Sequence, residues 1–587
     1  MAERKKQSLL TGAGVLAIAT VAVKLIGALY KIPLTNLITT EGFGYFSGAY
    51  AVYNPLYAIS MAGLPVAVAK MVSQNVELGK IKDAQLVFKV ARKLFFIVGL
   101  FGTVLLTAIA VPYSHLVKSP LNYISIIAVA PCILFCCMMS SFRGYYEGLN
   151  NMTPTGVSQV IEAIVKLTFG LAATYLCFNS WIKSYHEKAV DGVATVFGIE
   201  VHNEAEALSA IYPYAAAVAI LGVTLGSMFG LLYLFIRYKR KGFGFTREEI
   251  VNSPLPESES SIRKSLIKIA APVALSSVIL NVSNIIDDTT IRNRLAFALE
   301  SGESIIKEMF GASLAAAQTL DEGIVNYLYG AHASVLNIKN LVPTITLTLG
   351  ISAIPVLSRA WATKNKLGIK SAIESVLRVA MMIALPAGFG IAALAKPILT
   401  LFYPNLLHAV PIETPMLVLY GLGTFLFAIV SPITNMLQAV GRTDIPLRTV
   451  ALGSAVKIIL NFILVGNPEI NIFGAPVSTT VCYVLMLSIN LTSLLKVTGV
   501  KINFVSVFVK PLVAGAACGV TAYGAYFLFD SKLALGNTVS TAGAIVCGAG
   551  IYAILMLLIK GIAKDDLEML PKGEKIAKVL EKFGLLG

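Results

Sequence analysis

Five basic residues and one acid fall deep inside long apolar stretches of the sequence. The basic residues are Lys24, Lys31, Lys166, Lys339 and Lys457, and the acid is Glu162. A charged side chain at the centre of a membrane helix costs about 2.5–3.5 kcal/mol on insertion scales. We therefore expect these groups to face a polar cavity rather than lipid. An excess of cations in such a cavity suits an anionic substrate, such as a phosphate or pyrophosphate, and repels organic cations.

A second group of charges crowds the outer half of one apolar stretch, residues 281–294. Arg292 and Arg294 have the planar fork that suits bidentate contact with phosphate. Asp287 and Asp288 beside them could hold a coupling cation, Na⁺ or H⁺, or simply neutralise the arginines. Glu162 and Lys166 are four residues apart, so they can pair on one helix face, either as a structural ion pair or as substrate contacts.

Other chemistry finds little support in the sequence. The seven cysteines lie in apolar stretches without metal-binding spacing, and the five histidines are scattered. We therefore predict no metal site and no catalytic residues. The absence of a GxxxxGK[ST] loop predicts that the chain does not hydrolyse ATP, so no cofactor is expected beyond a coupling ion or the membrane potential.

Composition identifies the elements that must position these charges. The chain has 587 residues, of which 56% are hydrophobic and only 13% charged, against about 25% charged in soluble domains. Stretches long enough to cross a bilayer, which takes about 20 residues, recur along nearly the whole chain. We predict an all-α polytopic membrane protein with transmembrane helices at 9–36, 43–74, 86–113, 121–146, 153–178, 209–238, 266–294, 326–358, 370–398, 413–440, 446–466, 474–497, 507–529 and 538–560.

The distribution of charge predicts the orientation of these helices. Most of the 47 Lys and Arg residues fall on connections that share one side of the membrane with both termini. Basic loops stay in the cytoplasm, so both termini of this multi-pass membrane protein are predicted to be cytoplasmic. The net charge of +15 then comes mostly from the basic residues that hold loops on the cytoplasmic side, and nucleic-acid binding is not expected.

Two pairs of similar segments indicate an internal repeat. Residues 44–80 resemble residues 330–366, each with a proline in mid-helix, Pro55 and Pro343, and a basic inner end. Residues 162–167 resemble 453–460, and both pairs share a six-helix offset. We predict a six-helix N-lobe (1–238), a cytoplasmic linker (239–265), a six-helix C-lobe (266–497) and two further helices with a tail (498–587). The outer segments 180–208 and 296–325 have room for short surface helices.

Three stretches of the sequence resemble a known family. Residues 23–74, 140–167 and 435–461 are similar to the stage V sporulation protein B and polysaccharide biosynthesis proteins of Gram-positive bacteria. This family lies in the multidrug/oligosaccharidyl-lipid/polysaccharide (MOP) superfamily, which includes MurJ-type lipid II flippases. The resemblance covers nearly the whole chain. It implies two lobes around a cationic cavity, alternating access, and an undecaprenyl-pyrophosphate-linked sugar as substrate, with lipid II the leading choice.

The resemblance also implies where basic residues contact the substrate. Related flippases carry essential basic residues in helices 1, 2 and 8. Lys24 and Lys31 match those of helix 1, Lys70 is the only basic residue in helix 2, and Arg359 or Lys339 could match helix 8. Lysines where MurJ-type proteins favour arginine leave the bidentate pyrophosphate contact in doubt. The other partners expected are membrane lipids, and the protein is expected to be a monomer.

Three other functions are compatible with parts of the sequence. A drug or cation antiporter of the same fold would need a deep carboxylate in the first helix or its neighbours. The first helix has none, but Asp287 and Asp288 keep this function open. A membrane glycosyltransferase or polymerase would need acidic motifs or a large extramembrane domain, and neither is visible. A sporulation or assembly factor that transports nothing is a third alternative. For a flippase, we expect the lobes to rock on hinges near Pro33, Pro55 and Pro343.

Overall fold

The computed structural model describes residues 9–189, 193–242, 244–563 and 566. Within these residues, the regular elements are helices apart from one short hairpin. A helix satisfies its own backbone N–H and C=O groups, as a chain surrounded by hydrocarbon requires. The predicted fold class, an all-α polytopic membrane protein, is thus confirmed. The basic residues Arg4, Lys5 and Lys6 and most of the predicted C-terminal tail lie outside the described part.

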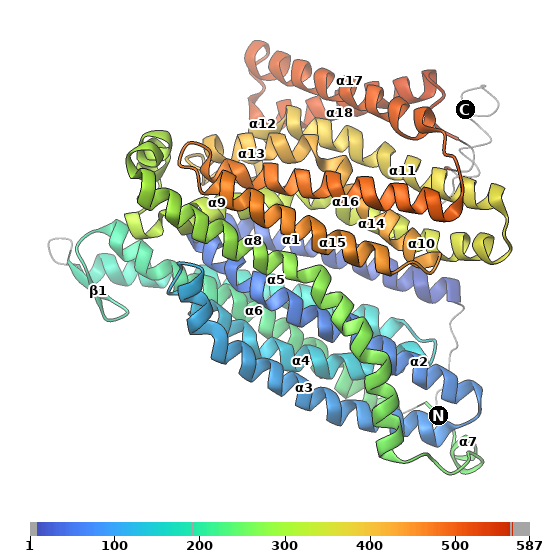
Figure 1. The fold of residues 1–587 in the computed structure, drawn as a ribbon. Helices are drawn as coiled ribbons and strands as arrows, with labels where there is room; N and C mark the ends of the chain where they lie inside the picture. The colour runs from blue at the N-terminus through green and yellow to red at the C-terminus, as the bar shows by residue number, and fades with distance from the viewer. Residues whose placement is uncertain (1–8, 190–192, 243, 564–565, 567–587) are drawn as a thin grey trace. The chain divides into compact units, whose positions relative to one another are not determined.

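The chain divides into two compact units, and each is described by itself. Unit 1 comprises Met1–Ala296 and Gln318–Gly330. Its elements are α1 (Leu9–Ala58), a π-helical turn (Ile59–Gly63), α2 (Leu64–Glu77), α3 (Ile81–Leu116), α4 (Asn122–Gly148), α5 (Thr153–Lys188), β1 (Ala194–Val196), β2 (Ile199–Val201), α6 (Glu204–Lys241), α7 (Arg247–Val251) and the first part of α8 (Glu259–Ala316). Helix α4 packs against α3 and α6, and α5 packs against α6 and α1, so these long helices run side by side (Figure 1).

Unit 2 comprises Phe297–Ala317 and Ala331–Gly587. After a 3-10 turn (Asp321–Gly323), its elements are α9 (Ile324–Lys339, beginning in unit 1), α10 (Leu341–Ala362), α11 (Lys366–Ala393), α12 (Ala395–Phe402), α13 (Val410–Leu422), α14 (Thr424–Ala439), α15 (Asp444–Leu460), α16 (Gly474–Thr498), α17 (Lys510–Phe527) and α18 (Gly536–Leu558). Single π or 3-10 turns follow α15 and flank α17. Helices α17 and α18 pack as a pair, and α17 also packs on α11 (Figure 1).

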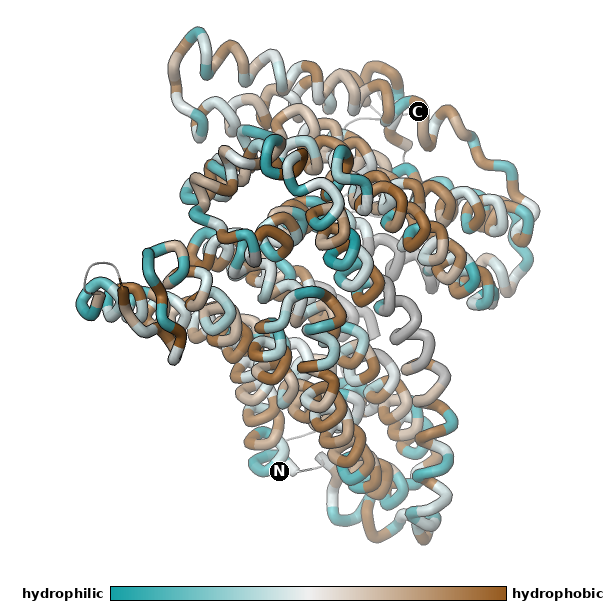
Figure 2. The backbone as a smooth tube through the Cα atoms, turned by 60° about the vertical axis from the view of Figure 1, so that its left-hand side comes forward, coloured by the Kyte–Doolittle hydropathy of each residue, from teal (hydrophilic) through white to brown (hydrophobic). Residues whose placement is uncertain are grey.

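The helices are long and apolar enough to span a bilayer. Ten helices among the described residues meet this test, or eleven if the bent pair α13 and α14 counts as one span. All fourteen predicted spans fall on helical residues, and the lower count arises partly because α1 joins the first predicted span to the start of the second. Hydrophobic residues predominate along the helices, whereas hydrophilic ones gather at many of their ends (Figure 2).

Several of these helices are interrupted. Helix α1 is broken at Thr39, whose φ of 61° and ψ of 178° are not helical, and this break separates the first two predicted spans. Of the prolines predicted as hinges, Pro55 precedes the π-helical turn and Pro343 follows the gap between α9 and α10, whereas Pro33 lies in a continuous stretch. Helices α13 and α14 meet at 46°.

The two long segments predicted to lie outside differ from each other. In 180–208 the described residues form no separate short helix: α5 extends to Lys188, α6 begins at Glu204, and an antiparallel hairpin pairing Ala194 with Val201 lies between them. Its two turn residues, Phe197 and Gly198, both have positive φ, as the tight turns favoured in hairpins require. In 296–325, α8 resumes after a break at Gly302 and runs to Ala316, which agrees with the expected helix.

The predicted linker 239–265 is folded against the N-terminal end of α3. The Ser253 hydroxyl accepts a hydrogen bond from the Lys82 backbone N–H at 3.0 Å, and Asp83 accepts one from the Glu257 N–H at 2.7 Å. Beyond it, the ammonium group of Lys89, with that of Lys93, lowers the pKa of the Glu259 carboxyl. This segment is therefore a docked connection within unit 1.

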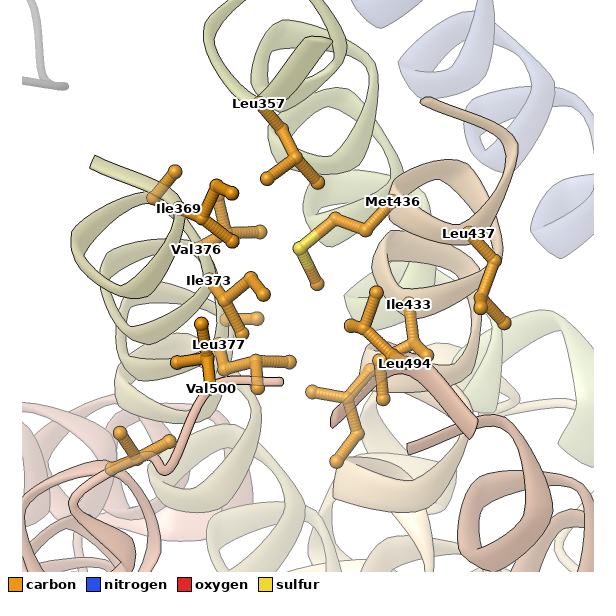
Figure 3. Packing of buried hydrophobic residues seen from close by; sticks show 14 of the residues in the cluster. Leu357, Ile369, Ile373, Val376, Leu377, Ile433, Met436, Leu437, Leu494 and Val500 are labelled. Carbon is orange, nitrogen blue, oxygen red and sulfur yellow. The ribbon is translucent and has the colours of Figure 1, made fainter. Parts of the chain in front are cut away.

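Unit 2 has a tightly packed core of aliphatic side chains. Ile373 and Leu377 of α11 face Ile433 and Met436 of α14, and Leu494 of α16 closes the cluster (Figure 3). Helices α11 and α13 approach closely at glycines. A Cβ added to Gly388 would lie 2.6 Å from the Gly421 carbonyl oxygen.

This close approach generates a prediction about stability. Gly388→Leu should lower the free energy of unfolding by about 1–3 kcal/mol, because the new side chain overpacks the contact with backbone that cannot move aside. The thermal unfolding midpoint in detergent would report it. Gly390→Leu on the same helix is the control, since nothing lies within 4 Å of its Cβ. Equal midpoints for the two variants would show that the helices are not so close.

Candidate functional site

Three lysines of unit 1 form a cluster without a direct ion pair to any described residue. Lys24 and Lys31 lie two helical turns apart on α1, before the break at Thr39, and Lys166 lies on α5, which packs against α1. The Lys31 Nζ lies 5.7 Å from the ring centre of Tyr50, and the Lys166 Nζ lies 5.5 Å from that of Tyr30. Lys31 and Lys166 are each close enough to Lys24 to be repelled by its charge, and Lys166 also acts on Lys31.

None of these three ammonium groups forms an ion pair or a side-chain hydrogen bond with a described residue. Lys24 is exposed, and Lys31 and Lys166 are half-buried. Three like charges that repel one another on apolar helices are unfavourable unless water or an anion solvates them. The cluster therefore has the properties of an anion site.

Glu162 compensates the cluster only in part, because its charge acts on Lys166 without a direct contact. The expected ion pair between Glu162 and Lys166 is absent from the ion pairs of the described residues. The Glu162 Oε2 instead lies 3.2 Å from Nη2 of Arg143 on α4. Arg143 is almost fully buried, and its Nε donates a 3.0 Å hydrogen bond to Ser158. Our sequence analysis missed Arg143, although it lies just inside the predicted span 121–146.

A row of aromatic rings extends along α1 beside the lysine cluster. Consecutive ring centres of Phe46, Tyr50, Tyr53 and Tyr57 lie 4.9, 5.7 and 5.2 Å apart. Tyr53 is buried, and its hydroxyl lies 3.1 Å from Cys132 Sγ. Sequence analysis did not single out this row, although aromatic residues spaced three and four apart were its visible signal.

Arg292 and Asp288 form a buried lock in unit 1. The Arg292 Nε donates to Asp288 Oδ1 at 2.8 Å, and the Tyr113 hydroxyl donates to Asp288 Oδ2 at 2.7 Å. The other two guanidinium nitrogens of Arg292 donate to Asn326 and, at 2.6 Å, to the carbonyl oxygen of Gly44. Both ions are fully buried. All three nitrogens of Arg292 thus bond protein groups that join α8 to α1 and α9, rather than pointing to a ligand.

The remaining predicted residues of unit 1 are less deeply buried than this lock. Asp287 and Arg294 are half-buried on α8, and Lys70 is exposed on α2. A Cβ added to Gly48 would lie 2.8 Å from Nη2 of Arg292, so the small residue at this position makes room for the guanidinium.

In unit 2, the predicted lysines are buried rather than free. The Lys339 Nζ lies 4.2 Å from the ring centre of Phe427, 5.1 Å from that of Tyr420 and 5.7 Å from that of Tyr483. Such an aromatic cage stabilises a cation through the ring faces. Lys457 is also buried, and Arg359 is exposed in the last turn of α10.

Unit 2 also contains a buried acid that sequence analysis did not select. Glu413 is fully buried at the start of α13 and accepts a hydrogen bond from the Ser334 hydroxyl. The Tyr403 hydroxyl donates to the Ser334 carbonyl oxygen at 3.2 Å. Glu413 was missed because it is the first residue of the predicted span 413–440. An acid at the end of a membrane helix is usually exposed to water.

Comparison with known proteins agrees with this architecture. Residues 9–184 match the family described as Polysaccharide biosynthesis protein, and residues 329–463 match the MatE family. The inward closed structure of the lipid II flippase MurJ has a TM-score of 0.62 at 14% identity, covering 93% of this chain and 98% of that one. An inward-facing MATE transporter of the MOP superfamily has a TM-score of 0.60 at 13% identity, covering 82% and 98%. This chain has the MATE and MurJ transporter fold.

Curated relatives are similar to this chain along most of its sequence. The chain is 24% identical to stage V sporulation protein B of Bacillus subtilis over 574 residues, 96% of this chain and 98% of that protein. It is 23% identical to the lipid II flippase MurJ of the same organism over 491 residues, 81% and 80% of the two chains. The resemblance identified from the sequence is confirmed. The relatives with a stated activity are transporters and flippases rather than enzymes.

The lock generates a prediction about stability. Asp288→Asn should lower the free energy of unfolding by about 3–5 kcal/mol, because it leaves the buried Arg292 charge uncompensated. Thermal unfolding in detergent would measure the loss. The double variant Asp288→Asn, Arg292→Gln should lose less than the sum of the two single variants, because the pair is removed together.

The exposed Arg448→Gln is the control for the lock and should change stability by less than about 0.5 kcal/mol. An Asp288→Asn midpoint equal to that of the control would contradict the buried ion pair.

Proposed function

We propose that this protein is a flippase for an anionic lipid-linked saccharide in the bacterial plasma membrane. The observation that carries the proposal is the cluster of Lys24, Lys31 and Lys166, in which no ammonium group forms an ion pair with a described residue, although Glu162 acts on Lys166 from a distance. A pyrophosphate would bring to it more negative charge than this one carboxylate supplies. Among known substrates of that chemistry, undecaprenyl-pyrophosphate-linked sugars fit, and lipid II is the leading candidate because a relative is a lipid II flippase.

The proposed mechanism is alternating access. Both termini lie in the cytoplasm, and the headgroup enters from that side and meets the lysine cluster while the polyprenyl tail stays in the bilayer. The irregular backbone at Thr39 and after Pro55 gives α1 places to bend as the site changes sides. An inside-negative potential draws the emptied cationic site inward, by about 2.3 kcal/mol per charge per 100 mV, and thus resets the carrier.

A cation-coupled antiporter is the second candidate function, and Glu413 is the observation that favours it. This buried carboxyl has an oxygen, Oε2, without a hydrogen bond to any described residue, so it could exchange a proton or bind Na⁺. Asp287 and Asp288 are the alternative coupling residues, although Asp288 is already paired with Arg292. The lysine cluster argues against an organic cation as the transported solute.

The proposal predicts that the cluster is essential for flipping. In liposomes, transbilayer movement of labelled lipid II should slow about 10- to 100-fold in Lys24→Gln, Lys31→Gln or Lys166→Gln, since a hydrogen bond to a charged group contributes about 1.5–3 kcal/mol. The movement is measured as the labelled fraction that becomes accessible to a quencher outside the vesicle.

Lys183→Gln, on α5 but exposed and paired with Glu187, is the matched control and should flip at the wild-type rate. Wild-type rates in all three cluster variants would exclude the cluster as the headgroup site. Failure of the wild type to move lipid II or other undecaprenyl-linked sugars, with ion-driven solute export abolished by Glu413→Gln, would establish the antiporter instead.

A further inference from the structure

We propose that one face of α1, formed by Tyr50, Asn54 and Tyr57, binds the saccharide of the lipid-linked substrate. In this arrangement, the sugar rings stack on Tyr50 and Tyr57. The sugar hydroxyls form hydrogen bonds with the polar atoms of Tyr50, Asn54 and Tyr57. The inference rests on the proposed function. It adds a second site, for the neutral part of the headgroup, next to the lysines that bind its charge.

The three residues share one face of the helix. Positions 50, 54 and 57 are related by steps of four and three, which places them on one side of α1. The face extends about 10 Å along the helix, at 1.5 Å per residue, a length comparable to a short oligosaccharide. Tyr50 and Tyr57 are half-buried, so part of each ring is accessible. The buried Tyr53 lies between them and holds both rings through contacts of 5.7 and 5.2 Å between ring centres.

The polar atoms of this face lack protein partners. The hydroxyls of Tyr50 and Tyr57 and the side-chain amide of Asn54 form no hydrogen bond with a described residue. The Tyr53 hydroxyl, in contrast, contacts Cys132. Polar groups inside a membrane protein raise its free energy unless they are hydrogen-bonded to protein or water. This face therefore requires water or a ligand rich in hydroxyl groups. A sugar offers both an apolar ring face for stacking and hydroxyls for these atoms.

The position of the charges sets the register of the substrate. Lys31 lies over Tyr50 at one end of the face, whereas Tyr57 at the other end is near the charge of Arg143; Glu162 is near both tyrosines. A pyrophosphate held by the lysines would therefore place the first sugar at Tyr50 and the following one toward Tyr57. There Glu162, whose side chain is 17% exposed, can accept hydrogen bonds from sugar hydroxyls.

An organic cation is a poorer occupant of the same face. Aromatic rings do bind cations, as the cage around Lys339 illustrates. Beside Tyr50, however, the ammonium groups of Lys31 and its two neighbours would repel a second positive charge. The rings of α1 are thus suited to a neutral ligand attached to an anion.

The test compares two lipids that share the polyprenyl tail and the pyrophosphate, of which only one carries the saccharide with its attached peptide. Dissociation constants for lipid II and for undecaprenyl pyrophosphate are measured with the purified full chain in detergent. Tyr57→Leu and Tyr50→Leu should each weaken lipid II binding about tenfold, a typical loss for an aromatic stacking contact, and change binding of undecaprenyl pyrophosphate less than about twofold. Tyr57→Phe should lie between wild type and Tyr57→Leu, because it keeps the ring and loses the hydroxyl.

Tyr523→Leu, an exposed position on α17, is the matched control and should bind both lipids as the wild type does. Unchanged unfolding midpoints would establish that the variants are folded. Equal weakening for both lipids, or no weakening for lipid II, would overturn the saccharide site while leaving the proposed function intact. A wild type that binds neither lipid would overturn the proposed function, and this inference with it.

Discussion

A charged side chain among apolar helices must be compensated by another charge, a polar group, water or a ligand. Which of these compensates it distinguishes structural residues from functional ones in this protein. In unit 1, Arg292 is enclosed with Asp288, and Arg143 with Glu162, so each guanidinium has a carboxylate within 3.2 Å. These pairs fix neighbouring helices to one another. The three lysines of the cluster have no such partner. The same unit thus compensates its arginines internally and leaves its lysines to be compensated by solvent or ligand.

Unit 2 also contains a buried ion pair, between Arg378 and Asp566, but it compensates other charges differently. The ammonium of Lys339 is enclosed by three aromatic rings, and the carboxyl of Glu413 is bonded to a serine hydroxyl. Neither arrangement presents a free charge in the way that the lysine cluster does. The asymmetry between the units suits a transporter whose headgroup is bound by one unit. It also explains why buried basic residues that look alike in the sequence have different surroundings.

Much of the fold could be predicted from the sequence, because a membrane helix is encoded by its own apolar residues. The spans, the break between the first two of them and the irregular helix after Pro55 all follow from local composition. The depth of Lys24, Lys31 and Lys166 also follows from their positions along those spans. The pairing of side chains from different helices does not. Glu162 could reach Lys166 along one helix, yet it pairs with Arg143 of α4, because tertiary packing brings that guanidinium within reach.

The same limit explains the other omissions. Arg292 resembles a free phosphate ligand in the sequence, and only the packing of α1, α3, α8 and α9 shows that its partners are Asp288, Asn326 and a backbone carbonyl. The hairpin at 194–201 has two strands of three residues joined by a tight turn. These strands are too short to show a recognisable alternation of apolar and polar residues. The aromatic row was visible as spacing, but its accessible and buried members can be told apart only from their contacts.

Binding of a pyrophosphate by the lysine cluster of unit 1 can be measured without transport. The measurement is the shift in unfolding midpoint that undecaprenyl pyrophosphate causes in the purified protein, compared with undecaprenol, which has the same tail without the charge. A ligand that binds only the folded state raises its stability. We expect the pyrophosphate to raise the midpoint of the wild type and undecaprenol to leave it unchanged, and we expect the shift to disappear when Lys24, Lys31 and Lys166 are all replaced by Gln. An equal shift in the triple variant would show that the cluster does not bind the pyrophosphate.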